Sequence, residues 1–149
     1  MKIRIFVAAV MAAISLSAHV QAESEADQVR HLLHKTFDKP ESRLVVDPVV
    51  VAEGYAIAGW SQGDMGGRAL LQSKHGRWML ILCAGDGIKS AEALSSAGIP
   101  SSAATSLATG LAKAEEKIPP YRLALFSKFE GLIRMDEAGN HPPVHHHKH

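Results

Sequence analysis

The residues with the clearest chemistry lie at the C-terminal end of the chain. Five of the last nine residues are histidines, namely His141, His145, His146, His147 and His149. Neutral imidazole is a ligand for copper, zinc and nickel, and a short histidine-rich tract is compositionally a metal binder. A purification tag is usually a uniform run, whereas here Lys148 breaks the run and His141 stands apart from it. We therefore predict a metal-binding tail, with adventitious affinity for metal as the alternative.

Two sulfur-containing residues, Met65 and Cys83, are the second candidate. Thioether and thiolate are soft ligands that favour copper(I). We expect three strands in up-and-down order, with a glycine-rich loop at 62–67 after the first and a second glycine loop after Cys83. This order places both sulfurs at one end of the sheet. The alternative is that Cys83 is a small buried hydrophobe, continuing a core strand, and that Met65 fills a gap.

Other polar pairs have simpler explanations. Asp64 and Asp86 are expected at the same end of the sheet, where two carboxylates could perform acid–base chemistry or bind a cation. Each stands beside glycine, however, and the aspartate of such a turn usually accepts hydrogen bonds from nearby backbone amides. His31 and His34 are three apart on a predicted helix, close enough to share a ligand, but two histidines on a polar helix face are usually solvated. We favour the simpler explanation for both pairs.

The sequence lacks the motifs of several enzyme classes. Gly85-Asp86-Gly87 is not followed by the third glycine of a dinucleotide fingerprint, and no Lys-Ser/Thr follows the segment 62–67. His-Glu-x-x-His and Gly-x-Ser-x-Gly are also missing. A nucleophile pair of Cys83 with His75 is disfavoured, because a hairpin turn at His75 puts the two at opposite ends of the sheet. We expect a non-enzymatic protein, and rank a thiol-dependent enzyme last.

The first 22 residues are typical of a secretory signal. Lys2 and Arg4 precede an apolar run that is too short to span a bilayer, and cleavage is expected near Ala22. No second run of spanning length follows, so we expect the mature protein not to cross a membrane. Without Lys2 and Arg4, fourteen basic residues face fifteen acidic ones. This near-neutral balance gives no indication of nucleic-acid binding.

The remaining residues predict one α+β domain over 23–136 and a disordered histidine-rich tail over 137–149. An N-terminal helix capped by Ser24 should precede an antiparallel β-meander of four to five strands. The first strand should be interrupted at Asp47-Pro48, which suggests an edge strand or a bulge. Two to three later helices should pack on the sheet. The elements expected are strands at 43–52, 55–61, 68–74, 78–83 and 132–135 and helices at 24–37, 91–97, 101–117 and 121–129.

Three segments carry a family resemblance. The segments 56–71, 78–89 and 126–131 resemble the small exported bacterial proteins called copper uptake system-associated proteins. The similarity runs from about Phe37 to Asp136, and its most specific parts are Gly-Asp-Met-Gly-Gly-Arg and Cys-x-Gly-Asp-Gly-Ile-Lys.

The resemblance implies a periplasmic accessory of copper uptake or delivery. Its partners would be a copper ion, as copper(I) or copper(II), and an inner-membrane copper importer or a periplasmic copper carrier. The tail histidines would capture the ion, with zinc or nickel as further ions for the tail, and Met65 with Cys83 would hold it as copper(I). The alternative is a protein-binding module that docks on a membrane partner while the tail only buffers metal.

Overall fold

The protein folds as an α+β structure around one antiparallel sheet. The computed structural model describes residues 23–135, so the predicted signal and the histidine-rich tail lie outside the described residues. The strands follow one another in space in chain order, β1-β2-β3-β4-β5. Their bounds are β1 Leu44–Ala52, β2 Tyr55–Gln62, β3 Met65–Lys74, β4 Arg77–Ala84 and β5 Leu132–Arg134. The helices are α1 Glu25–Phe37, the short 3₁₀ helix η1 Asp86–Ile88, α2 Ala91–Ser96, α3 Ser101–Glu115 and α4 Pro120–Phe126.

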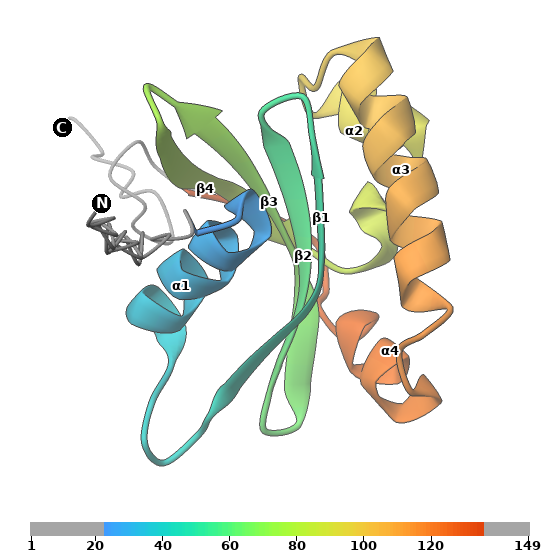
Figure 1. The fold of residues 1–149 in the computed structure, drawn as a ribbon. Helices are drawn as coiled ribbons and strands as arrows, with labels where there is room; N and C mark the ends of the chain where they lie inside the picture. The colour runs from blue at the N-terminus through green and yellow to red at the C-terminus, as the bar shows by residue number, and fades with distance from the viewer. Residues whose placement is uncertain (1–22, 136–149) are drawn as a thin grey trace, which may run out of the picture.

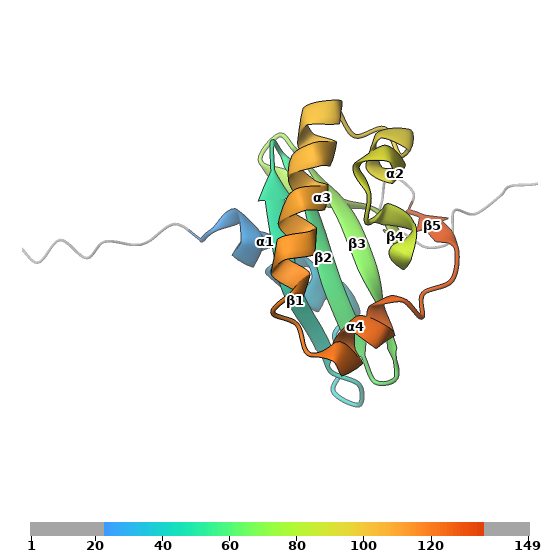
Figure 2. The ribbon, with the colours of Figure 1, turned by 90° about the vertical axis from the view of Figure 1, so that its right-hand side faces the viewer.

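The helices cover both faces of the sheet. Figure 1 shows α1 on one face and α2, α3 and α4 on the other. Figure 2 looks onto this second face, with α3 running along the sheet and α4 below it. Two apolar cores result. One packs Leu107 and Leu111 of α3 against the sheet, and the other packs Val29 and Leu33 of α1 against Cys83 and its neighbours. Because both faces are covered, the central strands are apolar on both sides, as predicted.

Two-residue turns join β1 through β4. In two of these turns both residues have positive φ. The angles are 50° at Glu53 and 80° at Gly54, and 50° at His75 and 74° at Gly76. This is the pattern of the type I′ turn, whose twist matches that of the flanking strands. The predicted primed turn at His75-Gly76 is confirmed. It fixes the register in which Lys74 pairs with Arg77.

The predicted glycine-rich loop at 62–67 is wrong. Only Gly63 and Asp64 form the turn, and β3 begins at Met65. Gly66 and Gly67 are paired strand residues, opposite Ser61 and Trp60. Their lack of a side chain is required by packing. A Cβ on Gly66 would lie 2.8 Å from the backbone carbonyl of Leu125 in α4.

The edges of the sheet confirm two further expectations. β1 is an edge strand whose pairing with β2 shifts between Val46 and Val49, around the cis Asp47-Pro48 bond. Proline is tolerated at such a position because no ladder hydrogen bond depends on its nitrogen. At the other edge, the predicted final strand is present as β5.

The helix boundaries are close to those expected, with one clear difference. Ser24 caps α1 by accepting a hydrogen bond from the Asp27 amide, and Gly98 ends the α2 segment at φ 98°. Helix α4 ends at Phe126 rather than at Phe129. The chain turns there because Phe129 packs against Trp60, with ring centroids 5.9 Å apart. None of the described helices is long and apolar enough to cross a membrane.

Candidate functional site

The structure does not bring Met65 and Cys83 together. Met65 stands beside the β2–β3 turn and is 50% exposed, whereas Cys83 is 7% exposed. Cys83 pairs with Ala69, four residues further along β3 than Met65. Four residues of strand span about 13 Å. The expected gathering of these two sulfurs is therefore wrong, because β3 begins three residues earlier than predicted and carries Met65 away from Cys83.

Cys83 instead lines a cavity between α1 and the sheet, which we call the α1 cavity. It has a volume of about 170 Å³. Its wall includes Leu33, Phe37, Trp60, Ala69, Cys83 and Met135. Almost all of this wall is apolar, so the thiol and the thioether are its main ligand atoms. Cys83 thus shares a cavity wall with Met135, and Met65 is not part of this wall.

Strand β5 positions Met135 next to Cys83. Ile133 pairs directly with Cys83, and the Met135 amide donates a 2.9 Å hydrogen bond to the carbonyl of Ile81. Side chains two residues apart on a strand share a face, and Met135 packs in the same core as Cys83. Sequence reasoning missed Met135. The alternation of the predicted strand 132–135 was the signal that could have found it.

The environment of Cys83 keeps its thiol protonated. Burial raises the pKa of Cys83 from 9.0 to about 12, because an apolar surrounding disfavours the thiolate. The thiol is therefore a poor nucleophile in the absence of a metal. Among residues 23–135, the side chains that line the cavity with Cys83 include no histidine, lysine or carboxylate that could take the proton of the thiol.

Polar contacts define the rest of the cavity. Gln62 donates through Nε2 to the carbonyls of Phe37 and Ser42, at 2.8 and 2.7 Å, and so ties the end of α1 to β2. The indole nitrogen of Trp60 is buried and has no hydrogen-bond partner among residues 23–135. Packing against Phe129, rather than a hydrogen bond, holds this ring in place.

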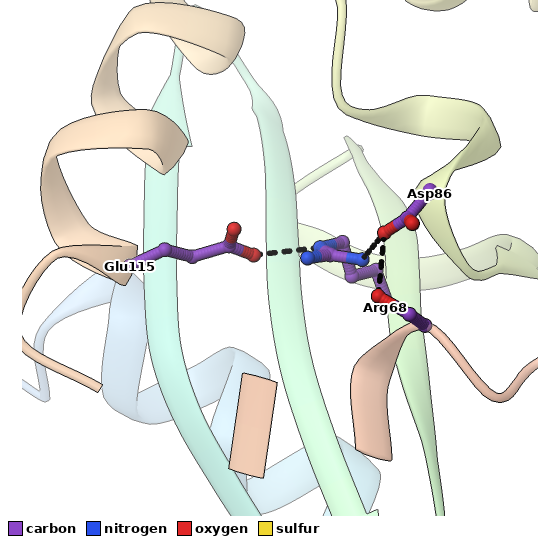
Figure 3. Close-up of polar contacts among 4 residues, drawn as sticks. Arg68, Asp86 and Glu115 are labelled. Atoms are coloured by element: carbon purple, nitrogen blue, oxygen red, sulfur yellow. Dashed lines mark hydrogen bonds and ion pairs between the residues drawn. The ribbon is translucent and has the colours of Figure 1, made fainter. Parts of the chain in front are cut away.

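On the opposite face of the sheet, Arg68 is the buried centre of an ion cluster. Its side chain is 1% exposed. Nε donates to Glu115 Oε1 at 2.6 Å, and Nη1 donates to Asp86 Oδ1 at 3.0 Å (Figure 3). The Asp86 carboxylate also accepts from Ser127 Oγ at 2.9 Å. The cluster joins β3, α3, η1 and the end of α4.

The position of Asp86 explains its ionisation. Burial alone would raise the pKa of Asp86, but the Ser127 hydrogen bond and the positive charges of Arg68 and Lys89 outweigh it and lower this pKa. Asp86 therefore stays ionised as the partner of Arg68. Asp64 lies at the turn, where its carbonyl accepts from Lys128 Nζ at 3.4 Å. The two aspartates thus make different contacts, and Asp86 has a structural partner.

A second buried arginine shares an aromatic neighbour with the first. The guanidinium carbons of Arg68 and Arg122 lie 5.4 and 5.3 Å from the centroid of the Phe126 ring, within the range of a cation–π interaction. Arg122 also donates through Nε to Ser61 Oγ at 3.3 Å. Sequence reasoning gave neither arginine a role. A charge within the apolar run Gly67–Leu71 was the available signal for Arg68.

The three histidines of the described residues form no metal centre. His31 is exposed and His34 half-buried on α1, and His75 is in the β3–β4 turn. Within residues 23–135, no group of three or more histidine, cysteine, aspartate or glutamate side chains is placed to hold a metal ion. His141, His145, His146, His147 and His149 lie outside the described residues.

Comparisons with known proteins give no relative. No family model, no curated protein and no solved structure matches this chain.

Proposed function

We propose that this protein is a non-enzymatic, periplasmic copper-binding accessory of copper uptake or delivery. The observation that carries the proposal is the histidine tract that begins six residues after Met135, with five imidazoles in nine positions. Imidazole binds copper(II) well, and several imidazoles on one short tract can share an ion. The α+β domain supplies the scaffold on which this tract is presented.

Features of the domain support a binding role rather than a catalytic one. Cys83 is buried in apolar surroundings, and its thiol is protonated. The Arg68 cluster pairs its charges with each other, so these groups are engaged in joining secondary-structure elements. A partner in this proposal is a membrane copper importer or a soluble copper carrier, which receives the ion from the tail.

The test is a titration of the full chain with copper(II) and, under anaerobic conditions, copper(I). The matched variant carries alanine at all five tail histidines, His141, His145, His146, His147 and His149. We expect the wild-type chain to bind copper(II) and the variant to lose this binding, while its circular dichroism spectrum is unchanged. Equal copper(II) affinity of both proteins, or no binding by the wild type, would contradict the proposal. Zinc and nickel titrations of the same pair measure the selectivity of the tail.

A second candidate function is a protein-binding module. The observation that favours it is the half-exposed side chain of Met65 beside the β2–β3 turn, since exposed methionine is common at adaptable binding surfaces. In this function the tail only buffers metal. The test is capture of a membrane partner by the wild type in the presence of a chelator and by the five-alanine variant. Equal capture by both proteins, together with loss of capture in Met65→Lys, would favour this second function.

A further inference from the structure

We propose that the α1 cavity is a copper(I) site, whose protein ligands are the Cys83 sulfur, as thiolate, and the Met135 thioether. This inference deepens the proposed function and rests on it. It assigns the interior of the domain a site that is separate from the histidine tract, and it replaces the expected pair of Met65 and Cys83.

The register of β4 and β5 brings Cys83 and Met135 to the same cavity. Cys83 pairs with Ile133, so Cys83 and Met135 are diagonal neighbours on the same face of an antiparallel pair. Diagonal neighbours lie about 7–8 Å apart at their backbones, within reach of a long side chain. Both side chains line one cavity, and methionine has the rotatable bonds needed to turn its sulfur towards an ion.

The charge of a Cys83 thiolate would balance the charge of a copper(I) ion in the cavity. A cation that enters an apolar cavity loses its hydration, which costs far more than an uncharged ligand would. Copper(I) and one thiolate together carry no net charge, so this complex fits an apolar wall. In the binding step the S–H bond of Cys83 breaks, an S–Cu bond forms and the proton leaves to solvent. No electron is transferred, because the copper enters and stays as copper(I).

The chemistry of the lining selects the ion. Thiolate and thioether ligands favour copper(I) over harder cations. Aromatic side chains of Phe37, Trp60 and Phe129 also line the cavity, and the face of such a ring attracts a cation within about 6 Å. Oxygen ligands of the kind that magnesium or calcium needs are almost missing from this wall, where Gln62 is the one residue with a side-chain oxygen.

The chain connects this site to the histidines. Met135 is six residues before His141. Six residues of chain reach at most about 20 Å. An ion held by the tract and an ion held in the cavity are therefore within one short tether. Copper that the tract holds as copper(I) can pass to Cys83 and Met135 without a change of oxidation state and without a second protein.

The test uses the full chain with all five tail histidines replaced by alanine, so that only the domain can bind. Copper(I) is added anaerobically in competition with a chromophoric chelator. We expect this parent to bind one copper(I) and to show the ultraviolet absorption of a copper(I)–thiolate bond. Cys83→Ser should weaken binding by about 100-fold or more, and Met135→Leu by about tenfold, each tenfold corresponding to about 1.4 kcal/mol. Met65→Leu is the matched control and should leave the affinity unchanged.

Trp60 provides an independent readout. Trp78 is the other tryptophan of the chain and does not line the cavity. In the five-alanine parent with Trp78→Phe, we expect copper(I) to quench the remaining fluorescence, and Cys83→Ser to abolish the quenching. If Cys83→Ser does not fold, the copper(I) affinity of Met135→Leu tests the site instead. Met135 is half-buried at a sheet edge, so this substitution should leave the fold intact.

The outcomes separate this inference from the proposed function. If the wild type binds copper and the five-alanine parent binds no copper(I), the tail is the copper site and the cavity proposal is wrong. If the parent binds copper(I) but Cys83→Ser or Met135→Leu matches it, the assigned ligands are wrong. If the wild type binds no copper in either oxidation state, the proposed function fails and this inference fails with it.

Discussion

Arg68 Nε lies 2.6 Å from Glu115 Oε1, although the two residues are 47 positions apart in the chain. Both side chains are buried. Neither charge is exposed enough to be stabilised by water, so each depends on the other. The pair ties the C-terminal end of α3 to β3, and Arg68 extends the connection to Asp86 at the start of η1.

Removal of one partner should therefore be costly. We expect Arg68→Met to lower the free energy of unfolding by about 3–5 kcal/mol, because it leaves Glu115 buried and unpaired. Arg43→Ala is the control, since Arg43 forms an ion pair with Asp38 but its side chain is 72% exposed. Such a pair contributes at most about 1 kcal/mol. Urea unfolding of both variants measures the difference, and similar losses would show that the Arg68 cluster does not stabilise the fold.

Gly66 should not tolerate a side chain. A Cβ there would lie 2.8 Å from the backbone of Leu125, and backbone atoms cannot turn aside as a flexible side chain can. We expect Gly66→Ala to cost about 1–3 kcal/mol, the usual range for overpacking. Gly87→Ala is the matched control, because nothing lies within 4 Å of a Cβ there. Thermal unfolding compares the two variants, and equal midpoints would contradict the close packing of α4 on β3.

The buried thiol should make stability depend on pH above 9. The folded pKa of Cys83 is raised from 9.0 to about 12. Above pH 9 the unfolded chain loses this proton while the folded chain keeps it, so the unfolded state binds fewer protons. The free energy of unfolding should then fall with rising pH, by about 1.4 kcal/mol per pH unit from this group. Below pH 9 the thiol is protonated in both states and contributes no slope.

Cys83→Ala separates this effect from other titrating groups. Urea unfolding of the wild type and the variant, at pH values on both sides of 9.0, gives two slopes. The wild-type slope should be the steeper one above this value only. Parallel curves across the whole range would mean that the thiol is not held in its neutral form by burial.

The β3–β4 turn offers a stabilising substitution. His75 has φ 50°, and asparagine followed by glycine is the preferred pair in a type I′ turn. We expect His75→Asn to raise the free energy of unfolding by a few tenths of a kcal/mol, with no change in copper affinity. Gly76→Ala, at φ 74°, should instead destabilise the protein by about 1 kcal/mol. Chemical denaturation tests the pair, and a destabilising His75→Asn would contradict the assigned turn.

Local patterns were sufficient to predict most of the secondary structure. Period-two apolar runs indicated the strands, and Ser24 and Gly98 marked helix ends through their known conformational preferences. The start of β3 could not be predicted in this way. Gly66 and Gly67 look like loop residues in the sequence. The close approach of Leu125 to Gly66, and of Trp60 and Phe129 to Gly67, explains why glycine stands at these strand positions.

The candidate sites were harder to predict for the same reason. The prediction grouped Met65 and Cys83 by strand direction alone. Because β3 begins three residues earlier than predicted, Met65 lies further from Cys83 than this grouping required. The shared position of Cys83 and Met135 on one cavity wall depends on β5, which joins the sheet beside β4 after almost fifty residues of intervening chain. The partners of Arg68 come from α3 and η1, so no local sequence signal could supply them.

The small size of β5 has a consequence for access to the domain interior. Four strands are joined by two-residue turns, whereas β5 adds only three paired residues at an edge. A short edge segment with a long connection is among the first parts of a fold to open while the rest stays folded. Detachment of β5 would remove Met135 from the cavity wall and uncover Cys83, without disrupting the other strand pairs. Amide hydrogen exchange should therefore be fastest in the sheet at Leu132–Arg134. We expect the access of an ion to the buried Cys83 thiol to depend on this local opening.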